Sequence, residues 1–259
     1  MLVDLHNHTT LCNHAEGTVD EYIEAAIKKG IKYFGFSDHA PMDFDPKYRM
    51  SFDEMSVYEK WINDAKIKYQ GKIEVLLGYE VDYLKGYMDE RVLNADVDFL
   101  IGSVHFIDGW GFDNPEFIGR YHTEDIDKIW QEYFDAIEEM AKFGKFDIIG
   151  HLDLIKVFKF MPKRDILSIA SNALKAIKKS GAVLELNMAG LRKPIEQTYP
   201  SQELLGEAYA LDIPITFGSD AHKPEQVGLY NENIIALARE VGYTKCAVFK
   251  NRDRELISF

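Results

Sequence analysis

Short apolar runs alternate with longer amphipathic segments along the whole chain. Seven of these runs have the length and composition of strands buried on both faces, namely residues 2–6, 32–37, 73–81, 98–104, 146–150, 182–187 and 213–218. Helical periodicity marks the segments near residues 19–29, 53–69, 87–94, 124–143, 165–180, 202–211 and 231–241. This alternation predicts an α/β fold in which helices cover a parallel sheet, and seven units favour a barrel over an open sheet.

Local signals support individual boundaries in this pattern. Thr18 and Glu21 have the spacing of a capping box at the start of the first helix, and Gly30 stands where a helix-ending glycine belongs. Residues 41–52 and 106–122 are predicted to be long loops, which in compact domains are often functional. Because the chain has no linker-like tract and no short repeat, we expect a single domain over residues 1–259.

Composition narrows the class of protein. The chain of 259 residues is 46% hydrophobic and carries 30 basic and 43 acidic residues, a formal net charge of −13. Such a surface repels nucleic acid, although a local cationic site would still bind a small anion. Cys12 and Cys246 are too few for a disulfide framework. With neither a signal-peptide pattern nor an apolar membrane span, the sequence predicts a cytoplasmic protein that does not bind membranes.

Polar residues follow the predicted strands at the point where each one ends. Seven of the eight histidines lie there, together with two acidic residues, and the set consists of His6, His8, His14, His39, Glu80, His105, His151, Asp220 and His222. His6 and His8 stand two residues apart, so both side chains point to the same side of the first strand. Only His122 falls elsewhere. The carboxyl ends of parallel strands form one rim of a barrel, where barrel enzymes build their active sites.

A cluster of this composition predicts bound metal. One histidine at a strand end is usually a structural residue, but many imidazoles and buried carboxylates together would be costly to desolvate without cations. Nitrogen and oxygen ligands without thiolate suit Zn, Mn or Fe. The nine candidate ligands exceed what one or two ions use, which points to three divalent ions. We interpret Cys12 as a small loop residue and not as a ligand.

The motifs resemble those of the polymerase-and-histidinol-phosphatase (PHP) superfamily, in order and over essentially the whole chain. Two further stretches resemble its histidinol-phosphate phosphatase branch, namely Gly150-His151-Leu152-Asp153 and the run Asn187-Met188-Ala189-Gly190-Leu191-Arg192-Lys193 followed by Tyr199-Pro200-Ser201. The resemblance implies a distorted (β/α)7, TIM-like barrel with a trinuclear site at the C-terminal ends of the strands. It assigns His6, His8, Glu80 and Asp220 to one ion, a bridging Glu80 with His105 and His151 to a second, and His14, His39 and His222 to a third.

The resemblance also implies a reaction, the hydrolysis of L-histidinol phosphate to L-histidinol and phosphate in histidine biosynthesis. We expect in-line attack by a hydroxide that bridges two ions, with Glu80, Asp220 and Arg192 as catalytic residues. Arg192 is the candidate phosphate clamp, and Lys156 a second, weaker phosphate contact. The proton for the leaving oxygen could come from Asp220 or from water on the third ion. Asp38 and Asp153 are candidates to orient histidine ligands, and surface or capping roles are the alternative.

Other functions remain open from the sequence. A related phosphoesterase could act on nucleotides, cyclic phosphodiesters or phosphotyrosyl protein, and a degenerate module could bind metal without catalysis. The filled set of nine ligand positions disfavours the second of these alternatives. An amidohydrolase would also use an HxH motif in a barrel, but we find no lysine at a strand end to bridge its metals. The partner expected is therefore a small phosphorylated substrate, while the oligomeric state is not predicted.

Overall fold

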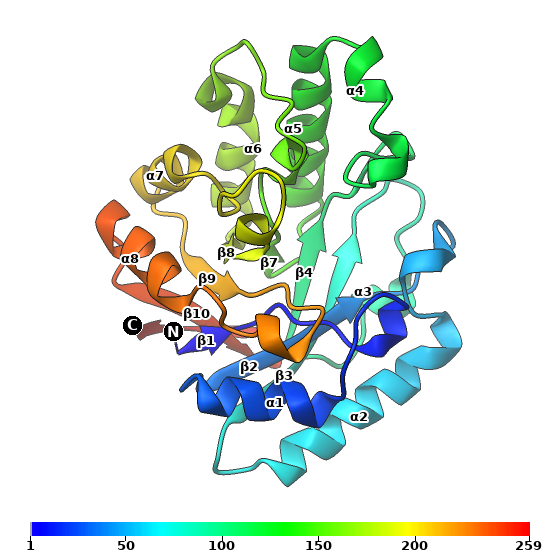
Figure 1. Cartoon of the computed structure of the whole chain (residues 1–259), viewed down its shortest axis with the longest axis vertical. Coiled ribbons are helices and arrows are strands. Elements are labelled where there is room, and N and C mark those ends of the chain that lie inside the picture. The colour runs from blue at the N-terminus through cyan, green and yellow to red at the C-terminus, as the bar shows by residue number, and fades with distance from the viewer. Residues whose placement is uncertain (1) are drawn as a thin grey trace.

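A parallel seven-stranded sheet forms the centre of the molecule in the computed structural model, which describes residues 2–259 (Figure 1). Its strand order is β1-β2-β3-β4-β7-β8-β9. The strands are β1 (Val3–Asp4), β2 (Tyr33–His39), β3 (Glu74–Asp82), β4 (Phe99–Ser103), β7 (Ile148–Ile149), β8 (Val183–Asn187) and β9 (Ile215–Gly218). Each lies within or across one of the seven predicted runs, so the predicted α/β barrel class is confirmed.

The sheet nearly closes on itself between its first and last strands. The Leu5 amide donates to the carbonyl of Phe217 at 2.9 Å, and the Asp220 amide donates to the carbonyl of His6 at 2.7 Å. A parallel bridge joins Asn7 to Ala221 just beyond these contacts. Closure of the barrel therefore brings the segment after β1 and the segment after β9 to one place, and these two segments carry the predicted HxH and DxH motifs.

Helices pack around this sheet, and α5 and α6 lie side by side on it (Figure 1). Thr18 and Glu21 form the predicted capping box of the first helix. The helices are α1 (Val19–Lys28), α2 (Met55–Lys68), α3 (Glu90–Leu93), α4 (Arg120–Thr123), α5 (Ile126–Phe143), α6 (Ile166–Ser180), α7 (Gln202–Ala210) and α8 (Asn231–Val241). The prediction of a helix over residues 87–94 is too long, because the Asp89 side chain accepts a hydrogen bond from the Arg91 amide and starts α3 there.

Close packing between strands explains two glycines within them. A Cβ on Gly35 would lie 2.7 Å from the ring of Phe99, and a Cβ on Gly78 would lie 2.6 Å from it. Phe99 is itself fully buried. The ring therefore fills the volume that side chains on β2 and β3 would otherwise take, and we expect neither glycine to accept alanine without a shift of the ring.

Two hairpins interrupt the predicted pattern. The predicted loop 106–122 contains a short antiparallel pair, β5 (Phe106–Ile107) and β6 (Trp110–Gly111), joined through Asp108 and Gly109 at φ values of 48° and 79°. This Asp-Gly turn is a hairpin signal that the loop prediction missed. The C-terminal pair, β10 (Lys245–Lys250) and β11 (Asp253–Ser258), was not predicted.

The β10–β11 hairpin covers the end of the barrel opposite the predicted site. Its turn residue Arg252 donates from Nε to Asp147 and from its amide to the carbonyl of Asp98 at 2.9 Å. Asp98 and Asp147 stand directly before β4 and β7, at the amino ends of those strands. The hairpin therefore leaves the carboxyl ends as the open rim. Among the described residues, no helix is long and apolar enough to cross a bilayer.

Candidate metal centre

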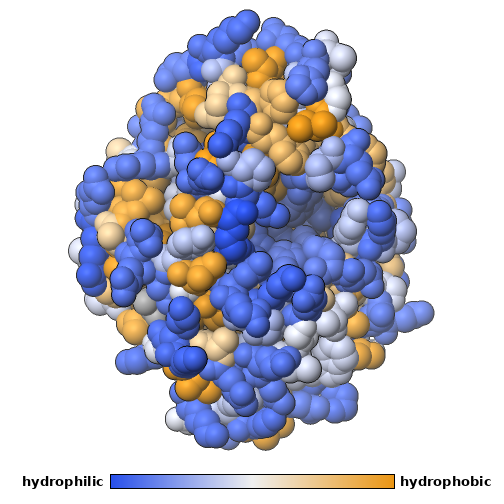
Figure 2. All heavy atoms as spheres, in the orientation of Figure 1, coloured by the Kyte–Doolittle hydropathy of each residue, from blue (hydrophilic) through white to orange (hydrophobic). Residues whose placement is uncertain are grey.

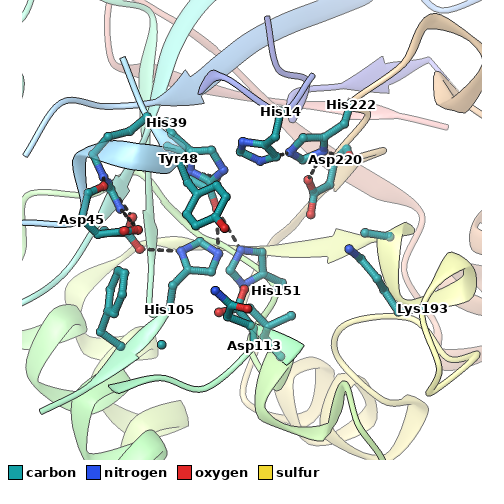
Figure 3. A pocket seen from close by; sticks show the side chains of 18 of the residues that line it. His14, His39, Asp45, Tyr48, His105, Asp113, His151, Lys193, Asp220 and His222 are labelled. Carbon is teal, nitrogen blue, oxygen red and sulfur yellow. Dashed lines mark hydrogen bonds and ion pairs between the residues drawn. The ribbon is translucent and has the colours of Figure 1, made fainter. Parts of the chain in front are cut away.

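A cavity of about 680 Å³ opens at the carboxyl ends of the strands. Figure 2 shows a recess near the middle of this face with mostly hydrophilic surroundings. Seven of the nine predicted ligands line it, namely His14, His39, Glu80, His105, His151, Asp220 and His222. His6 and His8 are fully buried, and their ring nitrogens reach Glu80 (Figure 3 shows the surrounding pocket). His122 lies on α4, where its ring packs edge-on against Phe160.

The first group of possible ligands lies deepest. Donor atoms of His6, His8 and Glu80 all lie within 4.8 Å of one another. The Glu80 carboxylate approaches His6 Nε2 through Oε2 at 3.3 Å, and Asp220 Oδ1 lies 3.3 Å from His8 Nε2. The tips of His6, His8 and Glu80 therefore converge, and Asp220 approaches the same nitrogen of His8.

Glu80 also belongs to a second group, with His105 and His151. Its other oxygen, Oε1, lies 2.8 Å from His151 Nε2 and 3.8 Å from His105 Nε2. One carboxylate thus presents one oxygen to each group. This is the position that a bridging ligand requires, and β3 places it there because Glu80 is buried near the carboxyl end of that strand.

A third group, His14, His39 and His222, lies nearer the cavity mouth. Nε2 of His14 and Nε2 of His222 are 3.0 Å apart, although these residues come from opposite ends of the chain. Cys12 lies near His8 and His222, and the three form a further group with ligand atoms within 4.8 Å of one another. The Cys12 side chain is buried and its thiol donates to the Thr9 carbonyl at 3.1 Å, which fits the predicted role of a small loop residue.

Carboxylates hold the far nitrogens of three of these imidazoles. Nδ1 of His6 lies 2.6 Å from Glu185 Oε1, Nδ1 of His8 lies 3.2 Å from Asp38 Oδ1, and Nδ1 of His105 contacts Asp82. Each contact fixes ring orientation and directs the Nε2 lone pair toward the cluster.

Asp38 is an acceptor predicted from the sequence, whereas Glu185 and Asp82 were not predicted. A signal for both was present in the strand periodicity. Asp82 follows Glu80 by two residues, and Glu185 precedes Asn187 by two, so each shares the side of its strand with a residue at the rim. The Glu185 carboxylate also explains Gly218, where a Cβ would lie 2.0 Å from Glu185 Oε1.

The electrostatics of the cluster favour a bound cation. Burial raises the pKa of Glu80, but His6, His39 and His105 outweigh burial and hold that pKa well below its usual range. Burial, opposed by Glu80 but reinforced by His8, lowers the pKa of His39 to about 4. The buried Glu80 carboxylate is therefore stabilised by neighbouring positive charge, which a bound cation would also supply.

Two buried imidazole nitrogens without hydrogen-bond partners also favour a bound cation. Nε2 of His6 and Nε2 of His8 are buried, and neither makes a hydrogen bond within residues 2–259. A buried polar atom without a partner is costly, and a divalent ion would satisfy both nitrogens at once. The residues present therefore fit the metal ions that the sequence predicts, in both donor chemistry and arrangement.

Charged residues of both signs line the rest of the cavity. Arg192 and Lys193 lie on one wall, and Asp45, Asp113 and Glu116 also face the cavity. Arg192 Nη2 donates to the carbonyls of Ser219 and Asp220, each at 2.8 Å, which fixes the guanidinium beside the Asp220 ligand position. Its Nη1 has no hydrogen-bond partner in the described part of the chain.

Two predicted residues lie elsewhere. Lys156 is buried outside the cavity lining, and its Nζ donates to Asp153 Oδ2 at 2.7 Å and to the Thr198 carbonyl at 2.8 Å. Asp153 is thereby engaged by a lysine and by the Ser201 amide, and no imidazole is bonded to it within residues 2–259. A phosphate contact by Lys156 and a histidine-orienting role for Asp153 are therefore not what the structure provides.

Replacing Lys156 with Met tests this placement. Because the ion pair is about 1% exposed on each side, removing one partner leaves Asp153 buried without its cation, and we expect the free energy of unfolding to fall by about 3–5 kcal/mol. KM for a phosphate ester should change less than about twofold, because the substitution removes no contact with the substrate. Chemical denaturation and steady-state kinetics measure the two effects, with Lys163→Met on the surface as the control. A raised KM at unchanged stability would contradict the placement.

Comparison with known proteins agrees with the fold and the cluster. The PHP domain family matches residues 4–189, and the PHP-associated family matches residues 207–236. A probable histidinol-phosphatase of Deinococcus radiodurans is 38% identical over 256 residues, 97% of each chain. The histidinol-phosphatase of Bacillus subtilis is 32% identical over 257 residues, 87% of this chain and 95% of its own.

A solved structure shares the architecture as well. The histidinol phosphate phosphatase of Lactococcus lactis, complexed with Zn, L-histidinol and phosphate, superposes with a TM-score of 0.81 at 22% identity over 98% of each chain. A parallel barrel with imidazoles and carboxylates at the carboxyl rim is typical of metal-dependent hydrolases. The chain belongs to the PHP family, in its histidinol-phosphatase branch.

Proposed function

We propose that this protein is a metal-dependent phosphate monoester hydrolase that converts L-histidinol phosphate and water to L-histidinol and phosphate. The observation that carries the proposal is the position of Glu80, whose two oxygens face two separate groups of imidazoles at the floor of one cavity. The family relationship supplies the substrate. A shared carboxylate between adjacent cation sites is the arrangement that phosphoester hydrolysis uses.

We further propose three divalent ions, Zn, Mn or Fe, in the groups described above. His6, His8, Glu80 and Asp220 would hold the first, Glu80, His105 and His151 the second, and His14, His39 and His222 the third. Bound ions of this kind supply charge neutralisation for the phosphoryl oxygens and activation of the attacking water. The nitrogen and oxygen donor atoms suit these metals, and Cys12, which lies near the described cluster, donates its thiol to the Thr9 carbonyl.

The chain's own residues position the substrate around that centre. Arg192, held by the carbonyls of Ser219 and Asp220, would bind phosphate oxygens with its free donors. Asp220 lines the cavity beside it, and the leaving oxygen would take its proton from Asp220 or from water at the third group. Because these groups lie close together at the ends of strands, they would hold the substrate in a fixed position for phosphoryl transfer.

The charge distribution of the cavity suits a substrate with both signs of charge. In Figure 3, Lys193 and Asp45 lie at opposite sides of the imidazole cluster, and Asp113 lies near His151. Burial raises the pKa of Asp113, which lines the cavity with His105 and His151. A cationic partner would satisfy this carboxylate. We propose that the phosphate binds at Arg192 and that the ammonium group of the aminoalcohol binds at Asp113.

A panel of phosphate esters tests the substrate proposal. We expect Asp113→Asn to raise KM for L-histidinol phosphate about 10-fold to 100-fold, the value of a hydrogen bond to a charged group, while KM for 4-nitrophenyl phosphate stays unchanged. Asp108→Asn, in the β5–β6 turn, is the matched control because Asp108 does not line the cavity. Steady-state kinetics on enzyme reconstituted with Mn or Zn measure both constants.

Two outcomes separate the parts of this proposal. If L-histidinol phosphate turns over no faster than generic esters, the substrate is wrong and the metal-dependent phosphatase remains. If the protein retains fewer than two ions and stays inactive after reconstitution, the metal centre itself is wrong. Elemental analysis of the same preparations distinguishes the two.

We also infer a single PHP-type domain over residues 1–259 and a cytoplasmic location. The barrel takes strands from both ends of the chain, since β1 closes against β9, so neither part of the sheet is complete alone. Cys12 and Cys246 are free and buried, as suits a reducing compartment. Limited proteolysis and denaturant-induced unfolding test the domain assignment. We expect a single cooperative unfolding transition.

A further inference from the structure

Arg49 is a buried arginine beside the cluster that belongs to none of the ligand groups. It lies between β2 and α2, and 4% of it is exposed. Its Nη1 donates to Asp82 Oδ2 at 2.8 Å and to the Ala40 carbonyl at 3.3 Å, and its Nε donates to the Asp45 carbonyl at 2.8 Å. Its own carbonyl accepts from Asn13 Nδ2 at 3.0 Å. Buried guanidinium groups carry such networks because their donors are fixed in one plane.

Three of these partners each adjoin a proposed metal ligand, and the ligand is a different one in each case. Asp82 is the acceptor for Nδ1 of His105. Ala40 directly follows His39, and Asn13 directly precedes His14. One residue therefore contacts the immediate neighbours of three ligands that come from three separate segments of the chain.

The side chain of Arg49 also supplies the charge that Asp82 needs. The Asp82 side chain is 1% exposed and faces both Arg49 and His105. Asp82 uses Oδ2 for Arg49 Nη1 and Oδ1 for His105 Nδ1, so Arg49 fixes the carboxylate that orients this ring. Nε2 of the same ring is then directed toward Glu80.

We infer that Arg49 is a positioning residue that sets the metal affinity of the two groups nearer the cavity mouth. It holds His105 through Asp82, His39 through the Ala40 carbonyl and the His14 loop through Asn13. The deep pair, His6 and His8, depends on Glu185 and Asp38 instead. This inference rests on the proposed ligand groups and does not depend on which phosphate ester is the substrate.

Metal retention by Arg49→Met tests the inference. Substitutions behind metal ligands typically cost 10-fold to 100-fold in affinity, so we expect the metal concentration for half-maximal activity to rise by about that factor. Elemental analysis after dialysis against a chelator should find fewer ions per chain than in the unsubstituted protein. At saturating metal, kcat should recover to within about threefold, because Arg49 acts on metal binding and not on the reacting atoms.

Two variants make the result decisive. Arg49→Lys keeps the charge but loses the planar fork, so we expect an intermediate loss of affinity, about 3-fold to 10-fold. Arg91→Met is the matched control, because Arg91 stacks on Phe52 of the same segment at 3.6 Å but pairs with Asp89 at the surface. Far-ultraviolet circular dichroism establishes that each variant is folded, and Arg49→Lys decides the matter if Arg49→Met does not fold.

Unchanged metal retention in Arg49→Met or Arg49→Lys would overturn the inference. An equal loss in Arg91→Met would overturn it too, because the effect would then be general to the segment. If the unsubstituted protein itself retains no metal, the proposed ligand groups are wrong, and that failure is distinct from a failure of the role of Arg49.

Discussion

Replacing Glu80 with Gln is expected to abolish turnover and to remove more metal than any single histidine substitution. Oε2 of Glu80 lies 3.3 Å from His6 Nε2 and Oε1 lies 2.8 Å from His151 Nε2, so one carboxylate serves two groups of imidazoles. Glutamine keeps the size of the side chain but loses its negative charge. We expect kcat/KM to fall by about 1,000-fold or more, equivalent to about 4 kcal/mol of transition-state stabilisation.

Two further substitutions show whether the effect of Glu80→Gln is specific to its position between two groups of imidazoles. His14→Gln alters only the group at the cavity mouth, and we expect a smaller loss, about 10-fold to 100-fold. Glu24→Gln, on the exposed face of α1, is the control for the loss of one negative charge. Kinetics and elemental analysis of the same preparations measure both effects. An active Glu80→Gln enzyme with its full metal content would refute the shared position of Glu80.

The rim of the barrel could be predicted because its residues follow a local rule. His39, His151 and Asp220 each come at or just after the end of an apolar run, and run ends are visible in sequence. Parallel strands place their carboxyl ends on one rim without further information. The strand pattern was therefore sufficient to find the cavity-lining histidines, although their spacing along the chain exceeds 200 residues between His14 and His222.

Residues that act through other residues could not be predicted in this way. Arg49 reaches Asp82 across 33 residues of sequence, and Glu185 reaches His6 across 179. Strand periodicity places Asp82 and Glu185 on the same side of their strands as a rim residue, but which side chain each one contacts is set by how loops and strands pack in three dimensions. Lys156 shows the converse, since it follows a strand as expected but a short 3-10 turn directs its side chain to Asp153 and away from the cavity.

The net charge of the whole chain does not describe the charge inside the cavity. The total of −13 disfavours a phosphate-backbone partner, yet the cavity is lined by Arg192 and Lys193 as well as by carboxylates. Glu80 and Asp220 are counted as free charges in that sum, but both belong to the proposed ligands. Three bound divalent ions would add about +6 locally, so a small phosphate ester would meet a positive site within an acidic protein.

Replacing Arg192 with Met is expected to produce the second large loss, in phosphate binding and not in metal content. Arg192 Nη2 is fixed by the carbonyls of Ser219 and Asp220, each at 2.8 Å, so the guanidinium is held beside the proposed ligand Asp220. Removing one such donor set from a preorganised site costs about 100-fold to 1,000-fold in kcat/KM. The inhibition constant for inorganic phosphate should rise with it, because the contact is made to phosphate oxygens in both complexes.

Lys193→Met is the matched control, since Lys193 lines the same wall and carries the same charge. A lysine ammonium is a flexible point charge without the fork of a guanidinium, so we expect a loss below about 10-fold. Arg192→Lys should fall between the two, because it restores charge but not two parallel hydrogen bonds. If Lys193→Met instead abolishes phosphate inhibition while Arg192→Met leaves it intact, the phosphate binds at Lys193 and the proposed orientation of the substrate in the cavity is wrong. If Arg192→Met loses metal along with activity, its bonds to Ser219 and Asp220 matter more than any contact with phosphate.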